Sequence, residues 1–191
     1  MKFVMIFGPQ AVGKMTVGQA LEKVTNFKLL HNHGTLELLT PIFGYGNKSV
    51  RKLSNLFRQE IFKEAAKSDL EGLIFTYVWA LNIKEDWDYV RDTCNIFRVE
   101  GGEVYLVELE APLEQRIERN KHPNRLKHKP TKRDLARSEK DLRGSLKKYR
   151  LNSQEGEIKE KNYLKVNNAD LSPDEVAQII KDKFSFCKVK N

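Results

Sequence analysis

The sequence predicts an α/β fold in which a five-stranded parallel sheet lies between two layers of helices. Short apolar runs alternate along the chain with stretches whose apolar residues recur at helical spacing, a pattern that favours a parallel sheet covered on both faces. The run Gly72–Ala80 is almost continuously apolar, as in a strand buried on both faces. Because 191 residues suffice for one domain with its own core, we expect a single domain over residues 1–191.

The apolar runs predict strands at Lys2–Phe7, Lys28–His31, Gly72–Ala80, Glu103–Leu109 and Tyr163–Val166. Helical spacing predicts helices at Lys14–Val24, Leu36–Phe43, Val50–Ala66 and Ile83–Val99, with Pro41, Gly44 and Gly46 interrupting the second and third of them. Pro112 fits the first turn of a further helix. The final helix is expected after Ser172, which can cap it, with Pro173 at its first position.

Composition indicates a soluble globular protein of the cytoplasm. The chain is 40% apolar and 31% charged, and it has no run of roughly 20 apolar residues such as a membrane span needs. The segment 1–8 leads directly into a glycine loop without a small-residue cleavage pattern, so we expect a strand rather than a signal peptide. Cys94 and Cys187 suggest neither a disulfide framework nor a metal site, and both are expected to be reduced.

The basic charge is concentrated in one segment. The net charge is +8, yet residues 119–150 hold 13 Lys and Arg against three acidic residues, and the remainder of the chain is close to neutral. Such a segment suits a polyanion, either nucleotide phosphates or a nucleic-acid backbone. The alternative is a solvated helix face that keeps the protein in solution.

A phosphate-binding loop is the most specific motif. Residues 8–16, GPQAVGKMT, contain G-x-x-x-x-G-K between the first predicted strand and the first predicted helix, which is the P-loop pattern. Glycines let successive backbone N–H groups point at phosphate oxygens, the helix N-terminus adds positive charge, and the lysine reaches the outer phosphates. We therefore predict ATP binding by Gly8, Gln10, Ala11, Val12, Gly13, Lys14, Met15 and Thr16.

The loop departs from the usual pattern after the lysine. That position normally holds Ser or Thr, whose hydroxyl binds Mg²⁺, but here it is Met15, with Thr16 one place later. The loop resembles the G-x-P-G-x-G-K-G-T variant of the nucleoside monophosphate kinases, which implies that Thr16 contacts phosphate. Mg²⁺ would then be held mainly by ATP, water and a carboxylate elsewhere. The third strand offers no acidic residue for this role, only Thr76.

The order of elements resembles that of the small P-loop kinases of the shikimate kinase, gluconate kinase and chloramphenicol phosphotransferase type. This resemblance implies a three-layer P-loop NTPase fold with a basic lid, which we place approximately at residues 119–133 and name the lid segment. In such kinases lid arginines close over the transferring phosphoryl group and neutralise its charge. Arg116, Arg119 and Arg125 lie in the matching stretch, and we favour Arg116 and Arg125 as catalytic residues.

The resemblance also suggests binding residues. Arg58, in Phe57-Arg58-Gln59-Glu60, is similar to an acceptor-binding arginine of shikimate kinases, although a surface position on a helix is the alternative. Asn168 follows the fifth strand where such kinases pack adenine, although a turn there would favour Asn anyway. Tyr77 and Trp79, near the end of the third strand, are assigned to the acceptor, with core packing as the alternative.

The general base is not an aspartate. Shikimate-type enzymes carry one near the end of the second strand, where this chain has His31-Asn32-His33. Histidine can accept a proton near neutral pH, so we assign His33 as the base and Glu37 as the reserve. Three alternatives stay open: both histidines bind zinc, although no third ligand is evident; the segment only satisfies backbone groups; or a phosphate acceptor needs no protein base.

Three functions are consistent with these motifs. The first is an ATP-dependent phosphotransferase, a P-loop kinase with Mg²⁺, acting on a small-molecule hydroxyl or phosphate. The second is a nucleic-acid end kinase or RNA-binding ATPase, suggested by the basic segment but weakened by its lack of interleaved aromatic residues. The third is a non-catalytic nucleotide-binding protein, suggested by Met15 and by the missing acidic residues. No membrane partner is expected.

Overall fold

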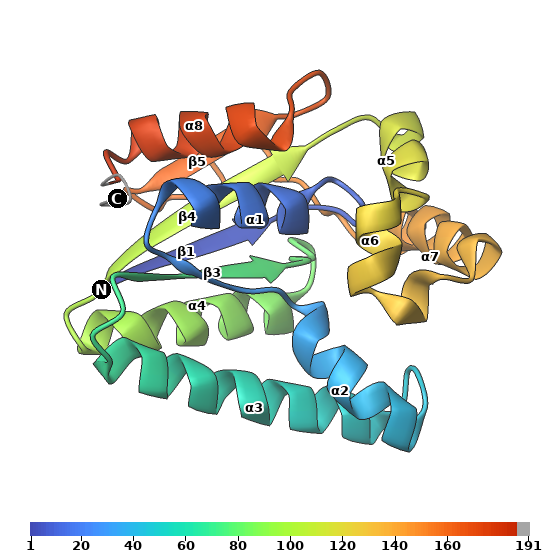
Figure 1. The fold of residues 1–191 in the computed structure, drawn as a ribbon, viewed down its shortest axis with the longest axis horizontal. Helices are drawn as coiled ribbons and strands as arrows, with labels where there is room; N and C mark the ends of the chain where they lie inside the picture. Colours follow the sequence, from blue (N-terminus) through green and yellow to red (C-terminus); the bar gives the residue numbers. More distant parts are fainter. Residues whose placement is uncertain (187–191) are drawn as a thin grey trace.

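A computed structural model describes residues 1–186 and confirms the five-stranded parallel sheet. The strands lie in the order β2-β3-β1-β4-β5, and every neighbouring pair is parallel. Because the first strand occupies the centre, the loop that follows it opens at the middle of the carboxyl edge (Figure 1). The strands are β1 (Lys2–Phe7), β2 (Lys28–Leu30), β3 (Gly72–Tyr77), β4 (Glu103–Glu110) and β5 (Tyr163–Asn167).

Helices cover both faces of the sheet, each over its own apolar cluster. On one face α1 (Lys14–Val24) and α8 (Pro173–Lys183) pack against each other and over residues such as Val4, Ile6 and Val107. On the other face α3 (Lys48–Lys67) and α4 (Lys84–Val99) cover Phe3, Met5 and Phe75 (Figure 1). The alternating side chains of β1 therefore enter two separate cores, which is why the strand is apolar throughout.

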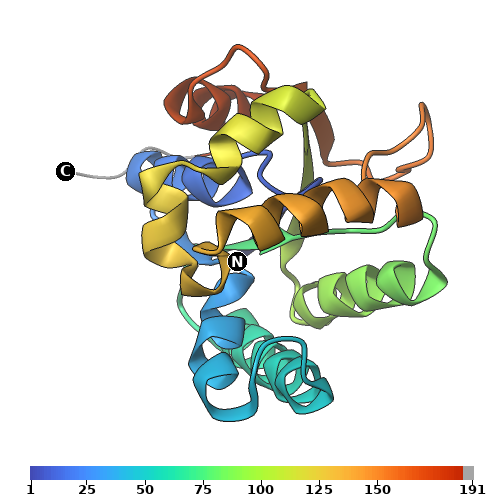
Figure 2. The same ribbon diagram turned by 90° about the vertical axis from the view of Figure 1, so that its right-hand side faces the viewer.

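The remaining helices gather at the carboxyl edge of the sheet. They are α2 (His33–Phe43), α5 (Leu113–Asn120), α6 (Pro123–His128), the 3-10 turn η1 (Pro130–Lys132) and α7 (Leu135–Lys148). The lid segment, residues 119–133, comprises the end of α5, α6 and η1, and η1 contacts both α2 and α7. Figure 2 views this edge and shows the lid segment extending from α5 toward α2.

Several predicted boundaries need correction. β2 ends at Leu30 and His33 begins α2, so the two histidines do not extend the strand as predicted. β3 ends at Tyr77, three residues early, and Pro41 lies inside α2 rather than interrupting it. The sequence reasoning missed α7, because this helix buries only Ser138, Leu142 and Ser145 and so has a weak apolar pattern.

The structure bears in part on the predictions about a membrane span and about the two cysteines. Among residues 1–186, no helix is long and apolar enough to cross a membrane. Cys94 is buried, and burial raises the pKa of its thiol to about 12, which disfavours the reactive thiolate. Cys187 lies outside the described residues.

Candidate functional site

The backbone between β1 and α1 has the curl of a phosphate-binding loop. Gly8 and Gly13 have φ values of +134° and +111°, and Ala11 also lies in the left-handed region at +60°. A Cβ at Gly8 would stand 2.3 Å from the carbonyl oxygen of Leu109. Glycine is therefore required at position 8 both by the backbone angle and by the close approach of β4.

Lys14 lies across the mouth of this loop. Its ammonium donates to the carbonyl oxygens of Gly8 (2.7 Å) and Pro9 (2.6 Å). Burial, together with the positive charges of Lys129, Arg125 and Arg116, lowers the pKa of Lys14 well below its ordinary value. A charged lysine held among other cations is stabilised when an anion arrives, so this arrangement favours a polyanionic ligand.

The two residues after Lys14 differ in their surroundings. Met15 is 5% exposed, and Thr16 is half-buried with its hydroxyl donating to the carbonyl oxygen of Gly13 over 2.8 Å. Both line the pocket at the loop. Of these two residues, only Thr16 brings a hydroxyl group to the pocket at the start of α1.

A pocket of about 310 Å³ opens beside the loop. Four Lys and Arg side chains line it, one from α1 and three from the lid segment, and no Asp or Glu is among its lining residues in the described part of the chain. An unbalanced set of cations around a glycine loop suits phosphate groups. The lining residues are Ala11, Gly13, Lys14, Met15, Thr16, Val17, Arg119, His122, Arg125, Lys129, Asn168, Leu171 and Pro173.

Lys129 is a site residue that the sequence reasoning missed. Burial and the charges of Arg125 and Lys132 lower its pKa to about 7, while Glu37 opposes this shift. Its own charge in turn lowers the pKa of both Lys14 and His33, so its ammonium lies within electrostatic range of each. Lys129 is one of the 13 Lys and Arg residues at positions 119–150, and no motif distinguishes it from the others. Only the fold directs its side chain toward the pocket.

The predicted arginines occupy different places. Arg125 lines the pocket and donates to the Oδ1 atom of Asn120 over 3.1 Å, and burial lowers its pKa to about 10. Arg116 is buried below the loop with its Nη1 atom 3.5 Å from the carbonyl oxygen of Gln10, and its Nε atom has no partner among residues 1–186. Arg119, not favoured from sequence, also lines the pocket.

Asn168 supports the phosphate loop from the opposite side. Its Nδ2 atom donates to the carbonyl oxygen of Val12 over 2.8 Å, and its side chain lines the pocket. Its backbone N–H donates to Glu110 at the end of β4. The side chain therefore contacts the loop itself, and contact with adenine remains a prediction.

Gln10 contacts α7. Its Oε1 atom accepts a hydrogen bond from the hydroxyl of Ser145 over 3.0 Å. This bond ties the start of the phosphate loop to the helix that follows the lid segment. The sequence reasoning placed Gln10 in the loop but had no basis for this partner.

The two histidines after β2 have separate partners. His33 Nδ1 lies 3.2 Å from Glu37 Oε1, one turn further along α2. Burial lowers the pKa of His33 to about 4, and the positive charges of Lys129 and Arg125 add to this shift against the opposing effect of Glu37. His31 instead packs edge-on against His128 of the lid segment. His33 is therefore neutral at pH 7 and keeps an unprotonated ring nitrogen, and the same low pKa makes the ring a weak base as long as the charges of Lys129 and Arg125 are not balanced by an anion.

Arg58 is not a surface residue. It is 5% exposed, and its guanidinium donates to the hydroxyl of Thr35 (3.0 Å) and to the carbonyl oxygen of Asn32 (2.9 Å). These bonds hold the turn that positions His33. Direct contact between Arg58 and an acceptor stays a prediction, since the side chain is already engaged with protein.

The two aromatic residues assigned to the acceptor lie in different environments. Trp79 is 2% exposed and packs between Phe7 and Trp87, so the structure corrects its assignment to the acceptor and places it in the core. Tyr77 is half-buried, donates to the Oδ1 atom of Asp86 over 3.2 Å and stacks on Tyr89. Burial raises the pKa of Tyr77, so its hydroxyl remains a neutral donor.

The donor atoms do not fit a metal ion held by the protein itself. Mg²⁺ prefers carboxylate oxygens, phosphates and water, and the pocket lining contains only Thr16 and Asn168 as oxygen-bearing side chains. Within the described range there is also no group of three His, Cys, Asp or Glu that could hold a metal such as zinc. Mg²⁺ would therefore enter this pocket only as part of the substrate MgATP.

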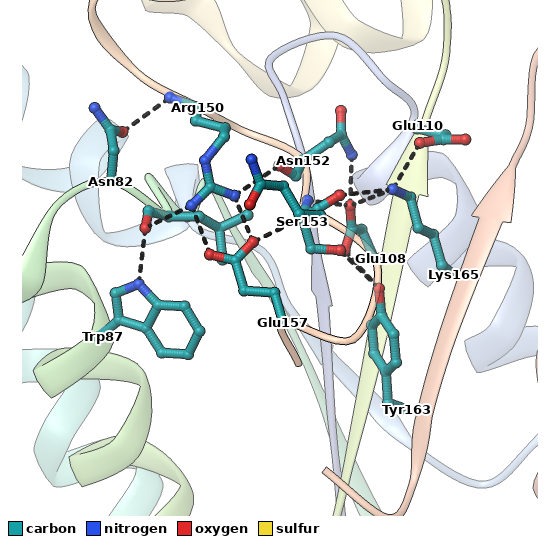
Figure 3. A network of polar contacts seen from close by, with 12 residues as sticks. Asn82, Trp87, Glu108, Glu110, Arg150, Asn152, Ser153, Glu157, Tyr163 and Lys165 are labelled. Carbon is teal, nitrogen blue, oxygen red and sulfur yellow. Dashed lines mark hydrogen bonds and ion pairs between the residues drawn. The ribbon is translucent and has the colours of Figure 1, made fainter. Parts of the chain in front are cut away.

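A polar network beside β4 and β5 holds the loop 150–157 in place (Figure 3). Glu108, fully buried on β4, accepts hydrogen bonds from Asn152, Ser153 and Tyr163. Asn152 Nδ2 also donates to the carbonyl oxygen of Leu109 over 3.1 Å, the same oxygen that Gly8 approaches. Glu108 thus lies near the end of β4, close to the phosphate loop, and its carboxylate anchors the loop 150–157.

Comparison with known proteins identifies the fold. No family model and no curated protein matches the sequence. A kinase-like protein from Chloroflexus aurantiacus superimposes with a TM-score of 0.65 at 16% identity, covering 95% of this chain and 97% of that chain. The APS kinase of Mycobacterium tuberculosis, solved with AMPPNP and APS, gives a TM-score of 0.60 at 16% identity, covering 96% and 97%.

The shikimate kinase of Acinetobacter baumannii, solved with shikimate, gives a TM-score of 0.56 at 17% identity, covering 96% of this chain and 93% of that chain. These similarities extend over the five strands and the surrounding helices. The chain therefore has the fold of the small P-loop kinases, which confirms the predicted fold class.

Proposed function

We propose that the protein is a phosphotransferase that moves the γ-phosphoryl group of MgATP to an oxygen of a small molecule. The observation that carries this proposal is the convergence of Lys14, Arg125 and Lys129 on one glycine-loop pocket that no Asp or Glu of residues 1–186 lines. Structural neighbours bound to AMPPNP or to shikimate support a nucleotide site beside an acceptor site in this fold.

The proposed reaction assigns a role to each of these groups. The acceptor oxygen forms a bond to the γ-phosphorus while the bond from phosphorus to the β–γ bridging oxygen breaks, and ADP leaves with the electron pair. Lys14, Arg125 and Lys129 would stabilise the negative charge on the equatorial oxygens. His33 would take the proton of a hydroxyl acceptor, whereas a phosphate acceptor needs no base.

ADP release from MgATP tests the proposal. The acceptors are nucleosides, nucleoside monophosphates, shikimate, gluconate, aminoglycosides and 5′-hydroxyl RNA, and the control is Lys14→Ala. We expect one acceptor class to stimulate ADP release at least tenfold, and Lys14→Ala to abolish the stimulation because the outer phosphates lose their lysine. Thermal melting of Lys14→Ala should show that the fold persists.

Two outcomes contradict the proposal. Tight ATP binding without turnover on any acceptor would favour a non-catalytic nucleotide-binding protein. Stimulation by RNA alone, with salt-dependent RNA binding, would favour the nucleic-acid function. The structure weakens support for the latter, since part of the basic segment is occupied by ion pairs such as Lys132 with Asp141 and Arg143 with Glu139.

A further inference from the structure

Glu37 forms a bridge between the proposed base and the lid segment. Its Oε1 atom lies 3.2 Å from His33 Nδ1 and 2.5 Å from the hydroxyl of Thr131, and its Oε2 atom accepts from the backbone N–H of Thr131 over 3.3 Å. Side-chain exposure is 15% for His33 and 18% for Glu37. One carboxylate thus connects α2 with the 3-10 turn of the lid segment.

The bridge determines where His33 carries its proton. Hydrogen bonds from His33 and Thr131 hold the pKa of Glu37 below its ordinary value against the opposing effect of burial, so the group is ionised at neutral pH. An ionised carboxylate can only accept hydrogen bonds, so His33 Nδ1 must carry the hydrogen. The lone pair of the neutral ring then lies on Nε2, and Nδ1 is the ring nitrogen that hydrogen-bonds within residues 1–186.

The same turn places a cation in the phosphate pocket. Lys129, which lines the pocket, is two residues before Thr131. A second anchor fixes the turn from the other side, because the Lys132 ammonium donates to the Tyr45 hydroxyl over 2.9 Å and Arg137 lies over the Tyr45 ring. Docking of the lid segment on α2 and on the α2–α3 loop therefore accompanies the entry of Lys129 into the pocket.

We propose that Glu37 is a positioning residue that couples docking of the lid segment to the proton-accepting tautomer of His33. The inference rests on the proposed function and deepens it, because it assigns Glu37 a role other than that of reserve base. With Thr131 docked, the carboxylate is held against His33 Nδ1 while Lys129 faces the γ-phosphate. Proton acceptance and charge stabilisation are thereby prepared by one movement.

The balance of charge in the step supports this role. A hydroxyl acceptor transfers its proton to His33 Nε2 as its oxygen attacks phosphorus, and the resulting imidazolium is paired with the negative charge of Glu37. The groups that face His33 are Glu37 on its own helix, and Lys129 and Arg125 from the lid segment. Because both lid cations oppose protonation of His33, the Glu37 carboxylate is the group that can stabilise the imidazolium.

Glu37→Gln and Thr131→Val test the coupling. Glu37→Gln removes the charge and keeps the shape, and we expect kcat with a hydroxyl acceptor to fall about 10- to 100-fold, with KM for ATP changed less than about twofold. Thr131→Val should lower kcat less, because its backbone N–H remains, and Thr131→Ser should restore it. Glu60→Gln, an exposed glutamate on α3, is the matched control and should leave turnover unchanged.

A double-mutant cycle separates coupling from two independent effects. If Thr131 acts through Glu37, then Thr131→Val should have no further effect on kcat once Glu37 is Gln. Additive losses would show that the two residues act separately and would overturn the coupling.

The ¹⁵N shifts of the His33 ring supply a readout that needs no acceptor. The wild-type protein should show a protonated Nδ1 and a bare Nε2, and Glu37→Gln should shift the ring toward a mixture of tautomers, with His33→Gln used to assign the signals. Unchanged shifts in Glu37→Gln would overturn the inference even if the protein is a kinase. Wild-type protein without turnover on any acceptor would instead contradict the proposed function, while the shifts would still decide the role of Glu37.

Discussion

Arg119 Nη1 donates to the carbonyl oxygen of Val12 over 3.1 Å, so a helix after β4 supports the phosphate loop directly. The Nη2 atom of the same guanidinium donates to the carbonyl oxygens of Asn168 (2.7 Å) and Ala169 (3.0 Å). One side chain thus joins the loop after β1 to the loop after β5. The two walls of the nucleotide pocket keep their spacing through this residue.

Replacing Arg119 by Met should weaken ATP binding about tenfold. Methionine keeps the apolar stem but loses the charged donors that join the two loops, and a tenfold loss of affinity corresponds to about 1.4 kcal/mol. Isothermal titration calorimetry with ATP measures the effect. Lys121→Met, an exposed residue at the end of the same helix, is the control, and equal affinities in the two variants would contradict the role of Arg119.

Thr16→Val should lower the affinity for MgATP about fivefold, corresponding to the roughly 1 kcal/mol of one hydrogen bond. Thr16 lines the pocket at the first turn of α1, and its hydroxyl donates to the carbonyl oxygen of Gly13, whereas valine has nearly the same shape without the hydroxyl. Thr16→Ser should bind like the wild type, because serine keeps the hydroxyl. If Thr16→Ser were as weak as Thr16→Val, packing rather than the hydroxyl would explain the loss.

The rate constant kcat/KM for ATP should fall as the pH rises above about 7. The pKa of Lys129 is lowered to about 7, so its ammonium is present below this pH and is progressively lost above it. Because kcat/KM reports the free enzyme, the decline should follow the lysine before ATP binds. Lys129→Arg, which stays charged, should move the decline to higher pH, and an unchanged profile would exclude Lys129 as its source.

Glu108→Gln should destabilise the protein by about 2 kcal/mol at pH 7, because a buried carboxylate with several donors is replaced by a group that must itself donate. Burial raises the pKa of Glu108, but hydrogen bonds from Ser153, Asn152 and Tyr163 hold it below its ordinary value. A lowered carboxyl pKa contributes stability above the unfolded-state value, and this contribution is lost as the pH falls through the folded-state pKa.

Urea unfolding at pH 7 and near pH 4 measures both effects of Glu108→Gln. The difference between wild type and variant should shrink at the lower pH. Glu110→Gln, which removes a partly exposed partner of Lys165, should cost less than about 1 kcal/mol. A Glu108→Gln protein as stable as the wild type would show that the network in Figure 3 contributes little.

Local sequence patterns suffice to predict the sheet, its parallel strands and the phosphate loop. These features depend on local patterns: apolar runs for strands buried on both faces, and glycines at Gly8 and Gly13 where the backbone takes positive φ values. They could be predicted because each residue type answers a requirement of its own short segment.

Which polar residues meet depends on packing between distant parts of the chain. Lys129 is one of many lysines in a basic segment, and its direction toward Lys14 and His33 depends on how the lid segment packs on α2. Trp79 enters the core and Arg58 is buried against the turn after β2, and the local sequence does not reveal either environment, because the same side chain can enter a core, a pocket or solvent. The pairing of Glu37 with Thr131, 94 residues apart, follows from long-range packing, which no spacing along the chain encodes.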